Sequence, residues 1–192
     1  MLKVLPVLAL CLLGAQAQKF NIAQCPTYDE QDNFELKRFL GKWYEAQTYS
    51  HGYERDLKCV ELDFTAGAND TIMNLNIKWK DSRNRDGQIV DTANMWFPGD
   101  FSSDMKIPMA PSVFLRDGSS YNVLGTDYET YAVVYSCPHY LFVLYYLNYQ
   151  NVWILTRDRN PSQQVLKNAQ EAFKRNTFLE KRRLRNSNQR GC

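Results

Sequence analysis

The chain of 192 residues has only two histidines, no Cys-x-x-Cys pair and no Gly-x-Ser-x-Gly sequence. Structural zinc sites need clustered Cys and His ligands, so these absences argue against a metal site. A phosphate-binding glycine loop is also missing, and His51 and His139 have no recognisable catalytic partner. The sequence therefore predicts no metal centre, no catalytic residues and no cofactor required for activity.

Strong charge of one sign is also absent. The formal net charge is +2, which leaves no global field to attract nucleic acid. The local exception is a basic cluster at residues 181–185, which we interpret as a solvated tail segment rather than a nucleic-acid or heparin patch. Beyond the N-terminus no apolar run is long enough to span a bilayer, since the stretch from Tyr140 to Leu147 has only eight residues.

The first 17 residues differ from the rest of the chain. Lys3 is followed by an apolar run from Val4 to Gly14 and then by Ala15-Gln16-Ala17. This is the layout of a secretory signal peptide with a small-x-small cleavage site. We therefore expect a signal peptide over residues 1–17, a single domain over residues 18–192, and a secreted, extracellular protein.

Five cysteines are present, and Cys11 lies inside the expected signal peptide. The other four form an even set that permits three pairings: Cys25, Cys59, Cys137 and Cys192. Their spacing alone does not choose among the three.

Short β-rich segments separated by turn signals run through the middle of the chain. Eight of them in succession, with no helix between them, favour an all-β fold, an antiparallel up-and-down barrel. The predicted strands are Lys42–Ser50, Leu57–Thr65, Thr71–Lys80, Gln88–Phe97, Ser112–Arg116, Tyr121–Thr126, Thr130–Cys137 and Val152–Arg157. The predicted turns include Asp86-Gly87 and the segment Pro98-Gly99-Asp100.

One α-helix is predicted from Asn160-Pro161 to about Lys174. Asn160 can cap it, Pro161 fits its first position, and Gln163 completes a capping box. Its apolar residues fall on one face, so we expect it to pack on the outside of the barrel near the C-terminus.

Three separated motifs are suited to sealing one end of such a barrel: Gly41-Lys42-Trp43-Tyr44, Thr126-Asp127-Tyr128 and Arg157. Trp43 is large enough to fill the end, and the Arg157 guanidinium can lie over its ring while donating to nearby carbonyls. The Thr-Asp-Tyr segment would form a tight turn in which the Asp side chain accepts from backbone amides. Each residue alone is commonly a core aromatic or a surface charge, but the ordered set is uncommon.

This ordered set resembles the three signature motifs of the lipocalins, over nearly the whole chain after the signal peptide. The resemblance is greatest to the branch that includes apolipoprotein D, insect bilin-binding protein and crustacyanin. It implies a non-catalytic secreted carrier that holds a small hydrophobic ligand: a lipid, sterol or retinoid, or a chromophore such as biliverdin or a carotenoid. It also implies the disulfides Cys25–Cys137 and Cys59–Cys192. One lipocalin subfamily is an isomerase that uses a free thiol, but the disulfide pairing would consume Cys59.

A cavity for an apolar ligand needs inward aromatic and aliphatic groups, and the chain has twelve Tyr, ten Phe and four Trp. Trp153 is the first candidate, on the strand that ends at Arg157. Strand alternation turns one residue in two inward. The alternative to lining the ligand cavity is, for each candidate, that it fills the core or faces outward. The other predicted aromatic ligand-binding residues are Phe64, Trp96, Tyr121 and Tyr135.

The third predicted strand allows two orientations, because Leu75, Ile77 and Trp79 alternate with polar residues. Simple alternation turns the apolar set inward. Resemblance to apolipoprotein D instead implies that Asn76 and Lys78 face the cavity. Lys78 would then pair with a ligand carboxylate, which favours a fatty acid or a tetrapyrrole over a sterol.

Two further features concern the surface. The apolar stretch over residues 140–147 suits transient membrane contact, a homo- or hetero-oligomer contact or a lid, and an extended hairpin is the plain alternative. It supports a second hypothesis, a non-carrier interaction module that acts through this surface. Asn69-Asp70-Thr71 is a glycosylation sequon in a predicted turn, so we expect Asn69 to be a glycosylation site.

Overall fold

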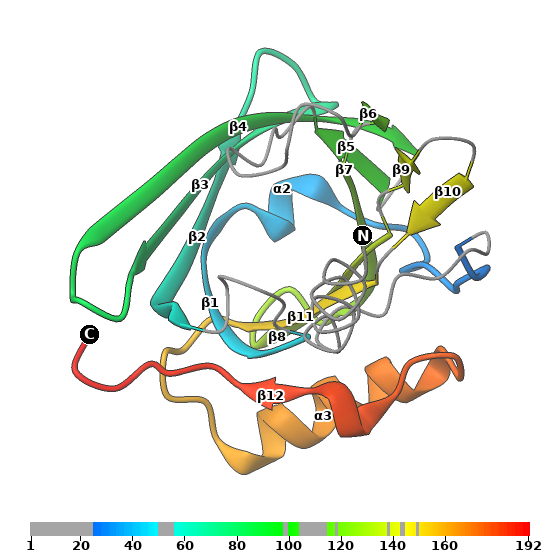
Figure 1. The fold of residues 1–192 in the computed structure, drawn as a ribbon. Helices are drawn as coiled ribbons and strands as arrows, with labels where there is room; N and C mark the ends of the chain where they lie inside the picture. Colours follow the sequence, from blue (N-terminus) through cyan, green and yellow to red (C-terminus); the bar gives the residue numbers. More distant parts are fainter. Residues whose placement is uncertain are drawn as a thin grey trace, which may run out of the picture.

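The computed structural model describes residues 25–49, 56–97, 100–103, 115–117, 119–137, 139–142, 145–148 and 150–192. Within these residues the main antiparallel sheet has nine strands in the order β11-β8-β7-β5-β4-β3-β2-β1-β12. β11 also pairs with β1, so eight of the strands close into a ring (Figure 1). The predicted all-β barrel is confirmed. The eight are β1 (Gly41–Thr48), β2 (Lys58–Ala66), β3 (Ile72–Lys80), β4 (Asp86–Phe97), β5 (Asp100–Ser103), β7 (Ser119–Thr126), β8 (Tyr131–Ser136) and β11 (Asn151–Thr156).

The fifth barrel strand differs from the prediction. β5 begins at Asp100, the last residue of the predicted turn, and pairs with both β4 and β7. The predicted strand Ser112–Arg116 lies partly outside the described residues, and its end belongs to β6 (Leu115–Asp117), which pairs with β9 in a separate sheet. Asp100-Phe-Ser-Ser has little intrinsic strand preference, so its two neighbours decide its conformation. Asp86-Gly87, predicted as a turn, begins β4 instead.

A second, three-stranded sheet joins β6 to a hairpin of β9 (His139–Phe142) and β10 (Tyr145–Asn148). An extended hairpin was one of the alternatives predicted for the apolar stretch at residues 140–147, and this hairpin is present. Its side chains at 140–147 lie outside the described residues. No helix in the described part of the chain is long and apolar enough to cross a bilayer.

The helix α3 (Gln163–Arg175) lies on the outside of the barrel against β7 and β8 (Figure 1). Its cap is Ser162, whose side chain accepts a hydrogen bond from the Val165 amide, and not Asn160 as the sequence suggested. Ala169, Ala172 and Phe173 form its buried face. Because β8 faces the barrel interior on one side and α3 on the other, its residues from Ala132 to Ser136 are all buried.

One end of the barrel is sealed by the short helix α2 (Leu36–Phe39), which lies across the ring of strands in Figure 1. Trp43, which is fully buried, packs against Phe39 of this helix. The Arg157 guanidinium lies 3.8 Å from the centre of the Trp43 ring. It donates hydrogen bonds to the carbonyl oxygens of Tyr128, Lys42, Arg38 and Phe39 at 3.0 to 3.3 Å. Gly41 has a φ of +98° and approaches the same guanidinium, so a side chain there would be strained.

The Thr126-Asp127-Tyr128 segment turns the chain at this sealed end. The Asp127 carboxylate accepts hydrogen bonds from the amides of residues 129, 130 and 131 and from the Thr130 hydroxyl. Burial opposes ionisation of Asp127, but these hydrogen bonds outweigh it and hold its pKa below the ordinary value. The Tyr128 hydroxyl accepts from the Glu35 amide, which fixes the approach to α2.

The C-terminal segment completes the wall beside β1. β1 pairs with β2 only from Gly41 to Tyr44, and further along β12 (Arg185–Asn186) pairs with its residues Gln47 and Thr48. The Gln189 side chain donates to the carbonyls of Glu45 and Val60, so it spans the separation between β1 and β2. Two disulfides fasten the chain, Cys25–Cys137 and Cys59–Cys192, which are the pairings that the resemblance implied.

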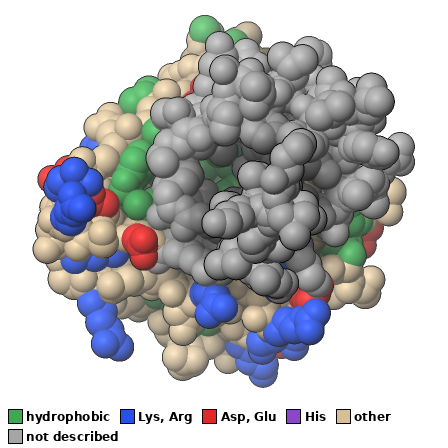
Figure 2. All heavy atoms as spheres, in the orientation of Figure 1, with side chains coloured by type: hydrophobic (Ala, Val, Ile, Leu, Met, Phe, Trp, Pro, Cys, Tyr) green, Lys and Arg blue, Asp and Glu red, His purple; other side chains and the backbone are tan. Residues whose placement is uncertain are grey.

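The basic cluster at residues 181–185 lies on the surface. Figure 2 shows Lys and Arg side chains along the lower margin of the molecule, where α3 and the C-terminal segment lie in Figure 1. Lys181, Arg182 and Arg185 are exposed, whereas Arg183 lies over the Tyr49 ring at 4.4 Å. This arrangement agrees with a solvated tail segment.

Candidate ligand-binding site in the barrel

The interior of the barrel is one apolar cluster contributed by most of its strands. Alternate residues of each strand point into it, as expected for a pleated sheet. The buried members from the barrel strands are Trp43, Val60, Leu62, Phe64, Met73, Leu75, Ala93, Tyr121, Val123, Ala132, Val134 and Leu155, with Ile77, Trp79, Met95 and Trp153 half-buried against them.

The floor of this interior is aromatic. The Phe39 ring lies 5.2 Å from Trp43, 5.1 Å from Phe64 and 5.3 Å from Phe34, measured between ring centroids. Phe64, predicted to line a pocket, belongs to this packed floor and is only 4% exposed. It supports a site above it and offers little surface of its own.

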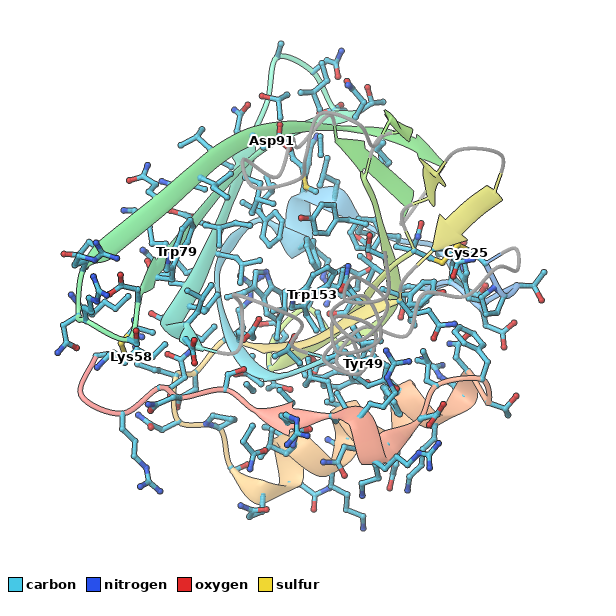
Figure 3. All side chains as sticks on the ribbon, viewed as in Figure 1. Cys25, Tyr49, Lys58, Trp79, Asp91 and Trp153 are labelled. Carbon is cyan, nitrogen blue, oxygen red and sulfur yellow. A yellow bond between two sulfur atoms is a disulfide. The ribbon has the colours of Figure 1, made fainter. Side chains whose placement is uncertain are left out.

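Two predicted residues come together above the floor. The rings of Tyr121 and Trp153 stack with 5.6 Å between centroids and 26° between planes. Figure 3 shows Trp153 near the middle of the ring of strands. Trp153 pairs with Thr48 at the end of β1 that lies away from Trp43, so it belongs to the half of the barrel farther from the sealed end. Its half-buried indole is suited to contact a guest.

Trp79 is a further inward aromatic group in the half of the barrel farther from the sealed end. It pairs directly with Gly87, and a Cβ on Gly87 would lie 2.3 Å from the Trp79 ring atom Cε2. The indole therefore lies across the bare backbone of β4, which only glycine permits. Figure 3 places Trp79 on the wall formed by β3 and β4.

The orientation of β3 is that given by simple alternation. Leu75, Ile77 and Trp79 face the interior cluster, so Asn76 and Lys78 point to the outside. Asn76 lies opposite Val90, which is 67% exposed, and Lys78 lies opposite Glu61 on the outer face. The expectation that Asn76 and Lys78 line the cavity was therefore wrong, because the apolar residues of β3 gain more by burial.

Tyr135 also lies outside the barrel interior. It belongs to the cluster between β8 and the C-terminal segment, where its ring meets Tyr28 at 5.2 Å and Phe178 at 5.5 Å. Burial raises the pKa of its phenol. Its placement as a pocket residue was wrong, because both faces of β8 are buried and hydrophobicity did not distinguish them. The side chain of Trp96, the remaining candidate, lies outside the described residues, as does His51.

Two acidic residues face the interior, and the sequence prediction missed both. Asp91 of β4 lies opposite Leu75, which is 1% exposed. Glu45 of β1 lies opposite Leu155 and accepts a 2.6 Å hydrogen bond from the Ser187 hydroxyl. Burial raises the pKa of Glu45 to about 7. Only the strand register reveals that either carboxyl points inward.

The sequence from residue 40 to residue 189 matches the model of the lipocalin / cytosolic fatty-acid binding protein family. The chain therefore belongs to this family. Apolipoprotein D of the rabbit, Oryctolagus cuniculus, is 31% identical, over 83% of this chain and 79% of its own. The bilin-binding protein of Pieris brassicae is 26% identical over 82% of this chain and 79% of its own.

Solved structures show the same fold. Insecticyanin from the tobacco hornworm Manduca sexta superposes with a TM-score of 0.70 at 17% identity, covering 89% of each chain. Lobster apocrustacyanin A1 superposes with a TM-score of 0.62 at 19% identity, covering 80% of this chain and 78% of its own. Membership of the family implies binding of a small hydrophobic ligand without catalysis.

Proposed function

We propose that this protein is a secreted carrier that takes up a small hydrophobic ligand inside the barrel and transports it. The observation that carries the proposal is the Tyr121–Trp153 stack, because it places a half-buried indole above a sealed aromatic floor. An interior closed at one end and lined by aromatic groups can enclose an apolar guest. The ligand is a lipid, a sterol, a retinoid or a pigment.

Export is supported by two long-range disulfides, which persist in oxidising compartments, and by the similarity to apolipoprotein D. The expected signal peptide over residues 1–17 lies outside the described residues. Asn69 lies in an exposed turn, where its side-chain oxygen accepts from Thr71, and this exposure suits glycosylation.

A titration tests the carrier proposal. Tryptophan emission is followed while retinol, progesterone, palmitic acid or biliverdin is added to the purified protein. We expect saturable quenching at one ligand per chain by at least one of the four. Trp153→Phe should reduce the amplitude, and Tyr135→Phe, on the outer face, should leave it unchanged. Absence of saturable quenching by all four would reject the carrier.

A pigment is the ligand subclass suggested by the similarity to bilin-binding protein. Absorption spectroscopy of protein purified from its source tests this subclass. A visible band that survives dialysis supports a bound chromophore such as biliverdin or a carotenoid, and a colourless native protein contradicts it. The alternative function, an interaction module or a membrane or oligomer contact through residues 140–147, stays a prediction.

A further inference from the structure

We propose that the cavity selects apolar ligands that carry a hydrogen-bond donor, a hydroxyl or an amino group, and that the Asp91 carboxylate accepts from it. The inference rests on the proposed carrier function and specifies the class of its ligand. It follows from the place of Asp91, from its hydrogen bonds and from the charges around it.

Asp91 lies on the inner wall of the barrel. Its pairing with Leu75 puts both side chains on the same face of the sheet. The next inward pair toward the sealed end is Met73 with Ala93, and each of these residues is 1% exposed. The next pair in the other direction is Ile77 with Ile89. Asp91 is thus a carboxylate set among apolar neighbours above and below. Figure 3 places it on the broad ribbon of β4.

The hydrogen bonding of Asp91 is incomplete. One oxygen, Oδ1, accepts from the amide of the adjacent Thr92 at 2.8 Å. The other, Oδ2, is buried and has no hydrogen-bond partner among the described residues. Buried polar groups in native proteins are nearly always satisfied, so an exception needs an explanation. An ionised carboxylate only accepts hydrogen bonds, so the missing partner must be a donor.

The charges near Asp91 favour a ligand that carries a hydrogen-bond donor over a ligand that carries a carboxylate. Among the described residues Asp91 takes part in no salt bridge, and Lys78, the base expected in the cavity, lies on the outer face. The second acidic residue on the inner face, Glu45, adds no positive charge to the interior. A ligand carboxylate would therefore meet repulsion at Asp91, whereas an alcohol or amine would satisfy Oδ2. The expected preference for a fatty acid or a tetrapyrrole over a sterol depended on Lys78 in the cavity, so it loses its basis.

Three retinoids provide a matched test, because they share one polyene and differ only at the head group. Retinol has a donor, retinyl acetate has none, and retinoic acid carries a negative charge at neutral pH. At pH 7.4, followed by tryptophan quenching, we expect retinol to bind about tenfold more tightly than retinoic acid, with retinyl acetate weaker than retinol. In Asp91→Asn the difference between retinol and retinoic acid should fall to within about threefold, since the amide both accepts and donates.

The control variant is Asp63→Asn. Asp63 lies on β2 between the inward Leu62 and Phe64, so its carboxylate is on the outer face. The variant removes the same charge without changing the interior, and its retinoid preference should equal that of the unaltered protein. Circular dichroism and thermal melting of each variant establish that it is folded.

A comparison in the unaltered protein keeps the proposal testable if Asp91→Asn does not fold. Hexadecan-1-ol should displace a bound retinoid at about a tenth of the concentration that palmitic acid requires. Equal displacement by the two, tighter binding of retinoic acid, or a preference unchanged in Asp91→Asn would overturn the inference and leave the carrier function intact. Failure of all these apolar ligands to bind would overturn both.

Discussion

The Ser187 hydroxyl donates a 2.6 Å hydrogen bond to the Glu45 carboxyl and so joins the C-terminal segment to the first strand of the barrel. Glu45 is buried opposite Leu155, in a position where a charge is poorly solvated. This pair makes the stability of the barrel depend on pH.

The direction of the pH dependence follows from the pKa of Glu45, which burial raises from 4.5 to about 7. Below pH 4.5 the group is protonated in both the folded and the unfolded state. As the pH rises from 4.5 through 7, the unfolded state releases a proton that the folded state retains, so the free energy of unfolding falls. By pH 8 the Glu45 contribution should have lowered it by about 3 kcal/mol.

Glu45→Gln should remove this dependence. Urea unfolding at pH 8 should find the variant more stable than the unaltered protein, whereas at pH 4.5 the two should agree. Glu171→Gln, on the exposed face of α3, is the control and should follow the unaltered protein at both pH values. If Glu45→Gln gave the same difference at pH 4.5 and pH 8, titration of Glu45 would not be the cause.

Arg157→Lys should destabilise the sealed end. Lysine keeps the charge but cannot direct donors to the four carbonyls that the guanidinium reaches while it covers Trp43. We expect a loss of about 2 to 4 kcal/mol in the free energy of unfolding, measured with urea. Ligand affinity should change by less than about twofold, since the site lies in the other half of the barrel. Arg182→Lys, on the exposed tail, should alter neither. A similar loss there would show that replacing any guanidinium by an amine has this effect, independently of the contacts to Trp43 and the four carbonyls.

The double variant Cys59→Ser, Cys192→Ser should loosen the C-terminal segment. The segment is held beside β2 by the hydrogen bond from the Cys59 amide to the Asn188 carbonyl and by the Gln189 contacts. Loss of the disulfide should lower the free energy of unfolding by at most about 5 kcal/mol. Hydrogen exchange should accelerate at residues 185–190 in this variant. It should not accelerate there when Cys25 and Cys137 are replaced by serine, and acceleration in both would contradict a local role.

Gly87→Ala should move the Trp79 indole, because the new Cβ would lie 2.3 Å from the ring. We expect ligand affinity to fall about fivefold to tenfold, with a loss of stability of about 1 to 3 kcal/mol. Retinol titration measures the affinity, near-ultraviolet circular dichroism reports the movement of the indole, and urea unfolding measures the stability. Asp86→Ala, at the neighbouring outward position, should preserve affinity. Unchanged affinity in Gly87→Ala would remove Trp79 from the site.

The barrel was predictable from the sequence because its strands alternate and its three motifs serve one end. The motifs that contain Trp43 and Arg157 can be recognised in the sequence without knowing the exact bounds of the strands between them. The strand Asp100–Ser103 was not predictable, because its four residues have weak strand preference and pair only after β4 and β7 are in place.

The polar features of the interior depend on register, which one sequence does not determine. Asp91 points inward only because it pairs with Leu75, and a one-residue slip would turn it to the solvent. Tyr135 was misplaced for a related reason: β8 is buried on both faces, so its apolar pattern does not say which face meets the ligand.

The position of a bound ligand tests the central claim most directly. A crystal structure of the protein with 12-bromododecan-1-ol, located by the anomalous scattering of bromine, would give that position. The account predicts one ligand inside the ring of strands, in contact with Trp153 and with its hydroxyl at Asp91. A ligand found only on the outer surface, such as the face covered by α3, or an interior that takes up none, would contradict it.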